Sequence, residues 1–123
     1  MLKIYKFFIV VLSISVVSGC YYDSEEDLYP AVVCKTDNVS FNTDIKPILA
    51  ASCLSCHVAT STIGGGIDLE THGNVLSYAN DGSLVGSIKH AAGYSEMPKS
   101  ASKLDDCKIA KIESWVKAGS PNN

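Results

Sequence analysis

Two cysteines and a histidine lie together in the segment CLSCH, where Cys53 and Cys56 are three residues apart and His57 follows directly. A Cys-x-x-Cys pair is found in zinc sites, in redox-active dithiols and, when a histidine follows it, in haem attachment sites. The remaining interpretation is an incidental pair of structural cysteines. The rest of the sequence has to distinguish these four possibilities.

The dithiol and the zinc site each lack a second requirement. A thioredoxin-like dithiol lies at the start of a helix in an α/β unit, and no strand pattern surrounds Cys53. A structural zinc ion needs four ligands, usually as a second spaced pair, whereas His72, His90 and Cys107 are single and scattered. An incidental pair leaves the adjacent His57 without an explanation.

Haem attachment explains all three residues at once. Two thiols one helical turn apart reach the two vinyl groups of a porphyrin and form thioether bonds with them. The histidine beside the second thiol is then placed under the iron as the proximal ligand. We therefore predict one covalent haem c, attached through Cys53 and Cys56, with His57 as an axial ligand of the iron.

A second axial ligand is expected further along the chain. Met97 is the one methionine outside the N-terminal leader, in the aperiodic stretch SEMPKS. Pro98 biases Met97 away from helical backbone geometry, and a thioether ligand raises the reduction potential of haem iron. We expect Met97 to be this ligand rather than a flexible core residue, with His90 as the rival and His72 as a more distant alternative.

The first 19 residues have the layout of a secretory signal peptide. Two lysines precede an apolar run from Phe7 to Val17, and small residues lead into Cys20. The run is too short for a comfortable transmembrane helix. The letters VSGC resemble a bacterial lipobox, so we predict that residues 1–19 are removed and that Cys20 carries lipid. An ordinary signal peptide cut nearby and a retained anchor are the alternatives.

The predicted export agrees with the predicted cofactor, because covalent haem attachment takes place outside the bacterial cytoplasm. Tyr21 after the cysteine resembles lipoproteins that are sorted to an outer membrane. We expect a lipid-anchored protein on a bacterial membrane, the outer rather than the inner one, facing the periplasm or the surface. Residues 20–33 are acidic and aperiodic, which predicts a solvated tether.

The domain that follows, residues 34–123, contains eight lysines, nine acidic residues and no arginine. This nearly neutral charge, without a basic cluster, does not indicate nucleic-acid binding. Free thiols oxidise outside the cytosol, and Cys34 and Cys107 remain once the other three of the five cysteines have a role. We expect them to form a disulfide, which would close a loop of about 70 residues and contribute on the order of 4 kcal/mol. Two unpaired buried thiols are the alternative.

Short helices have to position these residues. The stretch NTDIKPILAASC predicts a helix that starts at Asn42 or Thr43 and ends at CLSCH. TSTIGGGI predicts a loop, DLETHGNVLSYA and SLVGSIKHAA predict two short amphipathic helices, and GYSEMPKSASK has no period.

The last helix has the strongest pattern. Asp105 is its expected N-cap, and Gly119 and Pro121 are expected to end it. Its apolar stripe consists of Ile109, Ile112, Trp115 and Val116. No repeat and no alternating strand pattern is present, so we predict an all-α domain.

The order of these features in residues 41–119 resembles a class I (mono-haem) cytochrome c: a helix ending in CxxCH, short helices, a Met-Pro strap, and a last helix with an aromatic residue. The resemblance implies a small fold of short helices around one haem, and electron transfer rather than catalysis. It also implies a redox protein partner, and Lys89, Lys99 and Lys103 could steer an acidic docking face.

Two features depart from that family. Its first helix usually has a glycine and an aromatic residue where this chain has aliphatic ones, so the crossing of the terminal helices is expected to differ. The family often has a proline after the haem motif, whose carbonyl accepts the second N–H of the proximal histidine. Here the segment is VATSTIGGG, and a backbone carbonyl of this loop is expected to orient His57 instead.

Two other functions compete with electron transfer. One is a haem enzyme or gas sensor whose sixth site is open or ligated by histidine, with Glu96 and His90 as the local acid–base candidates. The other is a zinc-stabilised or purely structural lipoprotein.

Overall fold

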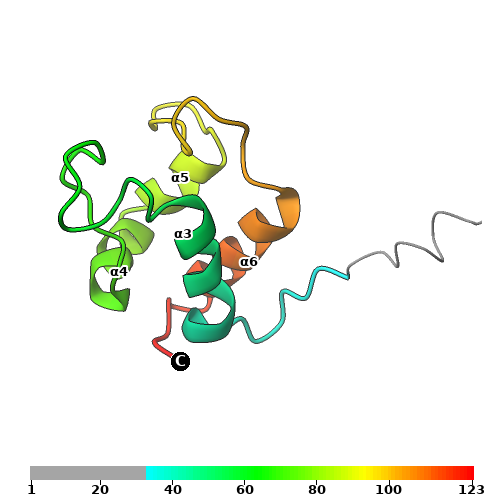
Figure 1. Cartoon of the computed structure of the whole chain (residues 1–123). Coiled ribbons are helices and arrows are strands. Elements are labelled where there is room, and N and C mark those ends of the chain that lie inside the picture. The colour runs from blue at the N-terminus through cyan, green and yellow to red at the C-terminus, as the bar shows by residue number, and fades with distance from the viewer. Residues whose placement is uncertain (1–32) are drawn as a thin grey trace, which may run out of the picture. The chain divides into compact units, whose positions relative to one another are not determined.

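Residues 33–123 are those that the computed structural model describes, and three of their helices begin after a residue whose side chain accepts a free backbone N–H. The helices are η1 (Phe41–Ile45), α3 (Lys46–Ser52), α4 (His72–Asn80), α5 (Ser83–Ile88) and α6 (Asp106–Lys117) (Figure 1). This part of the chain contains no strand, so the domain is all-α. The predicted signal peptide, Cys20 and the tether as far as residue 32 lie outside it. None of the helices in the described range is long and apolar enough to cross a membrane.

The first helix starts earlier than predicted, because Ser40 rather than Asn42 or Thr43 is its N-cap. The Ser40 hydroxyl accepts a hydrogen bond from the backbone N–H of Thr43 at 3.5 Å. The Asp44 carboxylate accepts one from the Ser40 N–H at 3.1 Å, which completes a reciprocal cap. The first turn is a π-helix, and α3 continues it with a proline in its first turn.

Helix α6 follows the predicted pattern closely. Asp105 is confirmed as its N-cap, since its side chain accepts the Lys108 N–H at 2.9 Å. Ile112 and Trp115 are fully buried, whereas Val116 is only partly buried against the core. Gly119 has a φ of 89°, a left-handed conformation that suits the residue after a helix end.

An aromatic cluster joins the first and last segments of the domain. Phe41 and Trp115 have ring centroids 5.5 Å apart, and His72 meets the edge of Phe41 at 4.8 Å. Phe41 at the start of η1 thus supplies an aromatic ring to this crossing, one residue before the helix start that the sequence predicted. The carbonyl of Asn123 also accepts the N–H of Asn42 at 2.9 Å.

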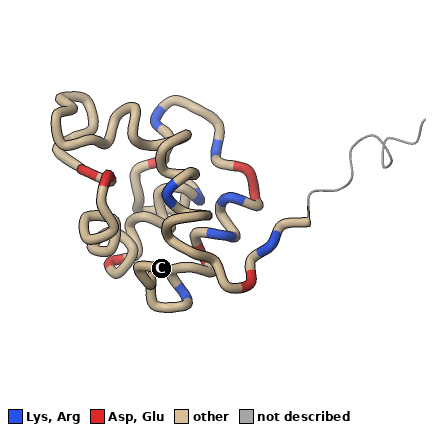
Figure 2. The backbone as a smooth tube through the Cα atoms, turned by 60° about the horizontal axis from the view of Figure 1, so that its bottom comes forward, with Lys and Arg blue, Asp and Glu red and all other residues tan. Residues whose placement is uncertain are grey.

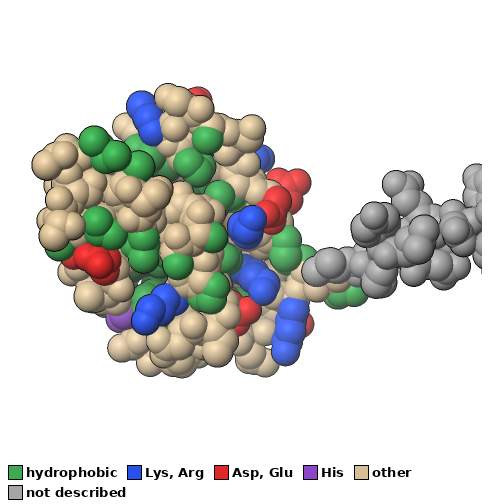
Figure 3. Space-filling view, in the orientation of Figure 1, with side chains coloured by type: hydrophobic (Ala, Val, Ile, Leu, Met, Phe, Trp, Pro, Cys, Tyr) green, Lys and Arg blue, Asp and Glu red, His purple; other side chains and the backbone are tan. Residues whose placement is uncertain are grey.

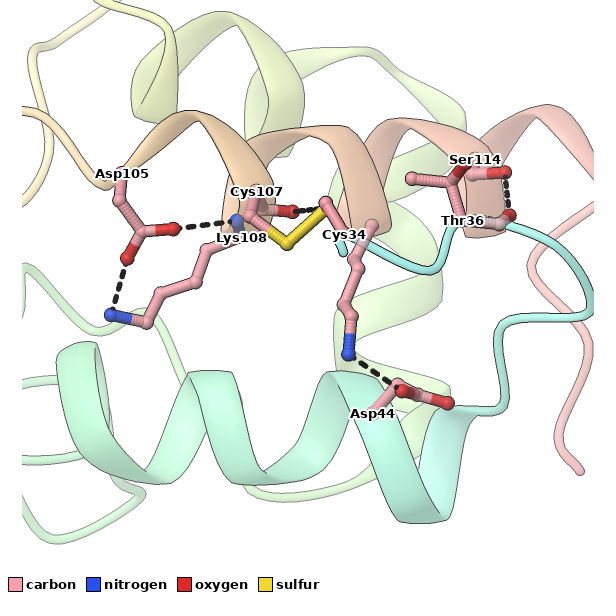
Figure 4. Close-up of a disulfide and its surroundings, with 8 residues drawn as sticks. Cys34, Thr36, Asp44, Asp105, Cys107, Lys108 and Ser114 are labelled. Carbon is pink, nitrogen blue, oxygen red and sulfur yellow. Dashed lines mark hydrogen bonds and ion pairs between the residues drawn. A yellow bond between two sulfur atoms is a disulfide. The ribbon is translucent and has the colours of Figure 1, made fainter. Parts of the chain in front are cut away.

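A disulfide and an ion pair hold the segments around α6 (Figure 4). The sulfur atoms of Cys34 and Cys107 are 2.11 Å apart, at bonding distance, although the two residues are 73 positions apart in sequence. Asp44 accepts a hydrogen bond from the ammonium group of Lys111 on α6 at 2.9 Å. We call η1, α6, residues 119–123 and the His72 side chain, which packs on Phe41 and Trp115, the terminal-helix end.

The opposite end of the domain is built from α4, α5 and two long loops, residues 53–71 and 89–105. Figure 2 shows basic and acidic residues interspersed over much of the domain, whereas residues 47–67 contain no Lys, Arg, Asp or Glu. In Figure 3, apolar side chains reach the surface on the face where α3 and the loop before α4 lie. We call α4, α5 and these two loops, which include the segments Cys53–His57 and 93–99, the cavity end.

Candidate functional site

The CLSCH segment forms a tight turn at the end of α3. The backbone N–H of Cys53 still bonds to the Leu49 carbonyl at 2.8 Å, as in a helix. The Cys53 carbonyl then accepts both the Cys56 N–H at 3.1 Å and the His57 N–H at 2.9 Å. One carbonyl therefore fixes the backbone of both later residues relative to the first cysteine.

His57 is almost completely buried, with 9% of its surface exposed. Its Nδ1 is the one buried side-chain nitrogen or oxygen without a hydrogen-bond partner among residues 33–123. The expectation that a carbonyl of the following loop orients this ring was therefore wrong for Nδ1. Leaving such a nitrogen unpaired costs about 1–3 kcal/mol, which is a cost that structures usually accept at functional positions.

Gly64 is required beside this histidine, and the sequence analysis did not identify it. A Cβ at this position would lie 2.0 Å from the Cys56 carbonyl oxygen and 3.1 Å from His57 Nδ1. Only a residue without a side chain lets the loop pass so close to the CLSCH turn. The three consecutive glycines at 64–66 were the available signal, since such a run commonly marks a close backbone approach or a special turn.

A cavity of about 430 Å³ opens next to the turn. Cys53, Cys56 and His57 line it from one segment, and Met97 and Pro98 line it from the loop before α6. The structure thus brings the four predicted ligand residues to one cavity although Met97 is forty residues from His57 in the sequence. This volume lies within the range of small-molecule and cofactor sites.

A second cavity, of about 360 Å³, adjoins the first. Five residues line both cavities: Cys53, His57, Ile67, Ile88 and Met97. The second cavity also has hydroxyl groups in its wall, including Tyr78 and Tyr94. Predicting these walls requires the tertiary arrangement, because they come from α4, α5 and two loops.

The two alternative histidine ligands lie elsewhere, and neither lines either cavity. His72 belongs to the aromatic cluster of the terminal-helix end, where its Nε2 is 2.8 Å from the Ser120 carbonyl. His90 lies after α5 with its Nε2 3.1 Å from the Met97 carbonyl. The structure therefore places Met97, and neither histidine, at the cavities.

Burial raises the pKa of the Cys53 thiol to about 11 from an ordinary value of 9.0. The cause is the loss of water around the charged form, because a thiolate is poorly solvated in apolar surroundings. A free Cys53 is therefore a protonated thiol at neutral pH and a poor nucleophile or metal ligand in that form. Within the described residues, no group of three or more His, Cys, Asp or Glu side chains is placed to hold a metal ion.

Two of the three lysines proposed for docking are engaged in ion pairs. Lys89 bonds to Glu113 on α6, and Lys103 lies 3.6 Å from Asp106. Lys99 lines the cavity of about 430 Å³ and takes part in no ion pair within the described residues. Lys99 is thus the one member of the set that combines an unpaired charge with a position at the cavity.

Comparisons of the chain with models of known protein families, with curated proteins and with solved structures find no significant match. The chemistry of the site is therefore inferred from the chain's own residues.

Proposed function

We propose that residues 34–123 form a class I cytochrome c-like domain that transfers electrons through one covalent haem. In this proposal Cys53 and Cys56 hold the haem, and His57 and Met97 are its axial ligands. The observation that carries the proposal is the meeting of these four side chains at one cavity from two distant segments. Two thiols, one imidazole and one thioether form the donor set that such a haem requires.

The haem would supply a one-electron redox couple, and the chain's residues would bind it and set its surroundings. Ile67 and Ile88 wall both cavities, so they exclude water and keep the local dielectric constant low. If His57 and Met97 both bind the iron, no coordination position would be left for a substrate. This is why we propose electron transfer rather than catalysis.

The proposal extends to the part of the chain beyond the described residues. We propose export through the signal peptide of residues 1–19, lipidation at Cys20 and attachment to a bacterial membrane, the outer one where the cell has two. The partner would be a redox protein, and Lys99 is the lysine best placed to meet an acidic partner at the cavity.

An absorption spectrum tests the cofactor directly. The mature chain would be produced with machinery for covalent haem maturation and purified in its ferric and ferrous forms. We expect a Soret band, a weak far-red band of sulfur-to-iron ligation in the ferric form, and pigment that stays with the protein in acid–acetone. Colourless protein, or pigment that acid–acetone extracts, would contradict the proposal.

The same preparation separates the competing functions. High-spin ferric iron, or rapid carbon monoxide binding by the ferrous form, would indicate an open sixth site and thus a haem enzyme or gas sensor. Stoichiometric zinc in colourless protein would indicate a structural lipoprotein.

A further inference from the structure

The segment that carries Met97 is anchored at the end of α5. The carbonyl of Ser87 accepts the N–H of His90 at 3.2 Å and also the N–H of Met97 at 3.1 Å. One oxygen thus fixes both ends of the loop 90–97. The Met97 N–H is therefore held by a backbone contact that does not depend on the side chains of the loop.

The acceptor side of Met97 is held by a side chain. His90 Nε2 lies 3.1 Å from the Met97 carbonyl oxygen. A carbonyl can only accept a hydrogen bond, so Nε2 is the nitrogen that carries the proton in this contact. The other ring nitrogen, Nδ1, lies 4.0 Å from the Glu96 carboxylate. At 4.0 Å this is no hydrogen bond, so the Nε2 contact is the one that orients the ring, whose side chain is only 21% exposed.

The backbone of His90 adopts a conformation that only some residues tolerate. Its φ is 55°, in the left-handed region, which residues other than glycine seldom adopt, although asparagine, aspartate and histidine do so more often than most. Such a conformation costs on the order of 1 kcal/mol for an ordinary residue. It turns the chain back at the end of α5 and thereby brings the imidazole to the Met97 carbonyl.

We propose that His90 is a positioning residue that holds the Met97 backbone so that the thioether stays at the cavity. This inference rests on the proposed ligation by Met97. It assigns His90 a role other than the rival ligand of the sequence analysis: the nitrogen that would bind iron is instead used to fix the residue that does. The Ser87 contact holds the N–H of Met97 and the His90 contact holds its carbonyl, so the Met97 backbone is fixed on both sides.

Two substitutions separate the side-chain contact from the backbone turn. Asparagine tolerates the left-handed conformation, but its shorter side chain does not reach the position of Nε2, so His90→Asn removes the donor alone. Glutamine carries an amide N–H at about the distance of Nε2, so His90→Gln should restore the hydrogen bond. His72→Asn is the matched control, because His72 also bonds to a carbonyl but lies at the terminal-helix end.

The first measurement is amide hydrogen exchange at Met97 in the purified mature protein, whether or not haem is bound. We expect faster exchange in His90→Asn, a rate close to that of the parent protein in His90→Gln, and no change in His72→Asn. Equal rates in all four proteins would overturn the inference. Faster exchange in His72→Asn as well would also overturn it, since it would indicate general destabilisation.

The second measurement uses haem-loaded protein and concerns the sixth ligand. Losing the anchor should weaken the far-red band and let imidazole bind to the ferric protein about five- to tenfold more tightly in His90→Asn, the equivalent of one hydrogen bond. His90→Gln should reverse most of this change. An unchanged imidazole affinity in His90→Asn would overturn the inference, while colourless parent protein would instead contradict the proposed function and leave the exchange measurement to decide on the anchor.

Discussion

The two ends of this domain differ in how completely the chain satisfies its own side chains. At the terminal-helix end, Trp115 is fully buried and its indole N–H donates to the Pro121 carbonyl at 2.9 Å. His72 has a carbonyl partner there as well. At the cavity end, His57 Nδ1 is buried without a partner, and two adjoining cavities separate the helices from the loops.

This difference indicates that the two ends of a domain of about ninety residues are stabilised in different ways. A domain of this size buries a limited apolar area and often depends on cross-links or cofactors. Here the cross-link is at one end, where Cys34 meets Cys107, and the free cysteines Cys53 and Cys56 are at the other. We infer that the terminal-helix end folds on its own contacts and that the cavity end is completed by its ligand.

The largest expected effect comes from removing both free thiols. Cys53→Ser combined with Cys56→Ser should abolish covalent haem attachment, because no thioether bond can form. The far-UV circular dichroism, which reports the helical content of the whole chain, should change much less. Denaturing gel electrophoresis with haem staining measures the first effect, and retained covalent haem in this variant would contradict our assignment of the attachment residues.

Removing the disulfide should weaken the opposite end. Cys34→Ser with Cys107→Ser should lower the free energy of unfolding by about 4 kcal/mol, since the unfolded chain gains the freedom of a long loop. Urea denaturation of the parent and the variant, both haem-free, measures the loss. A difference below about 1 kcal/mol would show that the bridge does not support the terminal-helix end.

A pair of glycine substitutions sharpens the contrast between crowded and open positions. Gly64→Ala should destabilise the domain by about 1–3 kcal/mol, because the new methyl group overlaps the Cys56 carbonyl. Gly73→Ala in α4 meets nothing within 4 Å and should stabilise its helix by up to about 1 kcal/mol. Thermal unfolding compares the two, and a Gly64→Ala variant as stable as the parent would refute the close approach at His57.

The smallest expected effect concerns acid stability at the terminal-helix end. The hydrogen bond from the Lys111 ammonium, followed by that from the Ser40 N–H, lowers the pKa of Asp44 below its ordinary value of 3.8. The stabilisation is therefore complete well above pH 3.8 and is lost as the pH falls through the lower, folded-state pKa. Lys111→Met should cost about 1 kcal/mol at pH 7 and less below pH 3.

Urea titrations of the parent and Lys111→Met at both pH values provide the measurement. A cost that is the same at both would mean that the lysine contributes through packing of its aliphatic chain rather than through its charge.

The parts that sequence reasoning predicted are those set by local chemistry. The N-cap at Asp105 and most of the buried stripe of α6 follow from residue types at fixed spacing, and the end of the first helix at CLSCH was predicted as well. Phe41 was missed because its ring packs on a residue far along the chain, which no local period reveals. The role of Gly64 was missed for the same reason, since its neighbour is a carbonyl eight residues earlier.

His90 shows the limit of interpreting residue types without geometry. An isolated histidine near a predicted haem is reasonably considered a ligand, and sequence alone contains no sign of its left-handed backbone. The turn at the end of α5 decides where the ring lies, and tertiary contacts decide that turn. Ligand residues that are consecutive in sequence are therefore easier to identify than the residues that position them.

Trp115 is positioned to serve as an intrinsic fluorescence probe of folding. It is the sole tryptophan of the chain, and it is fully shielded from water beside Phe41 and His72. Its fluorescence emission will report on the folding of the terminal-helix end, while visible absorbance would report on the cavity end in protein that carries the proposed haem. Recording both signals during a single refolding reaction would show whether the two halves form together or in sequence.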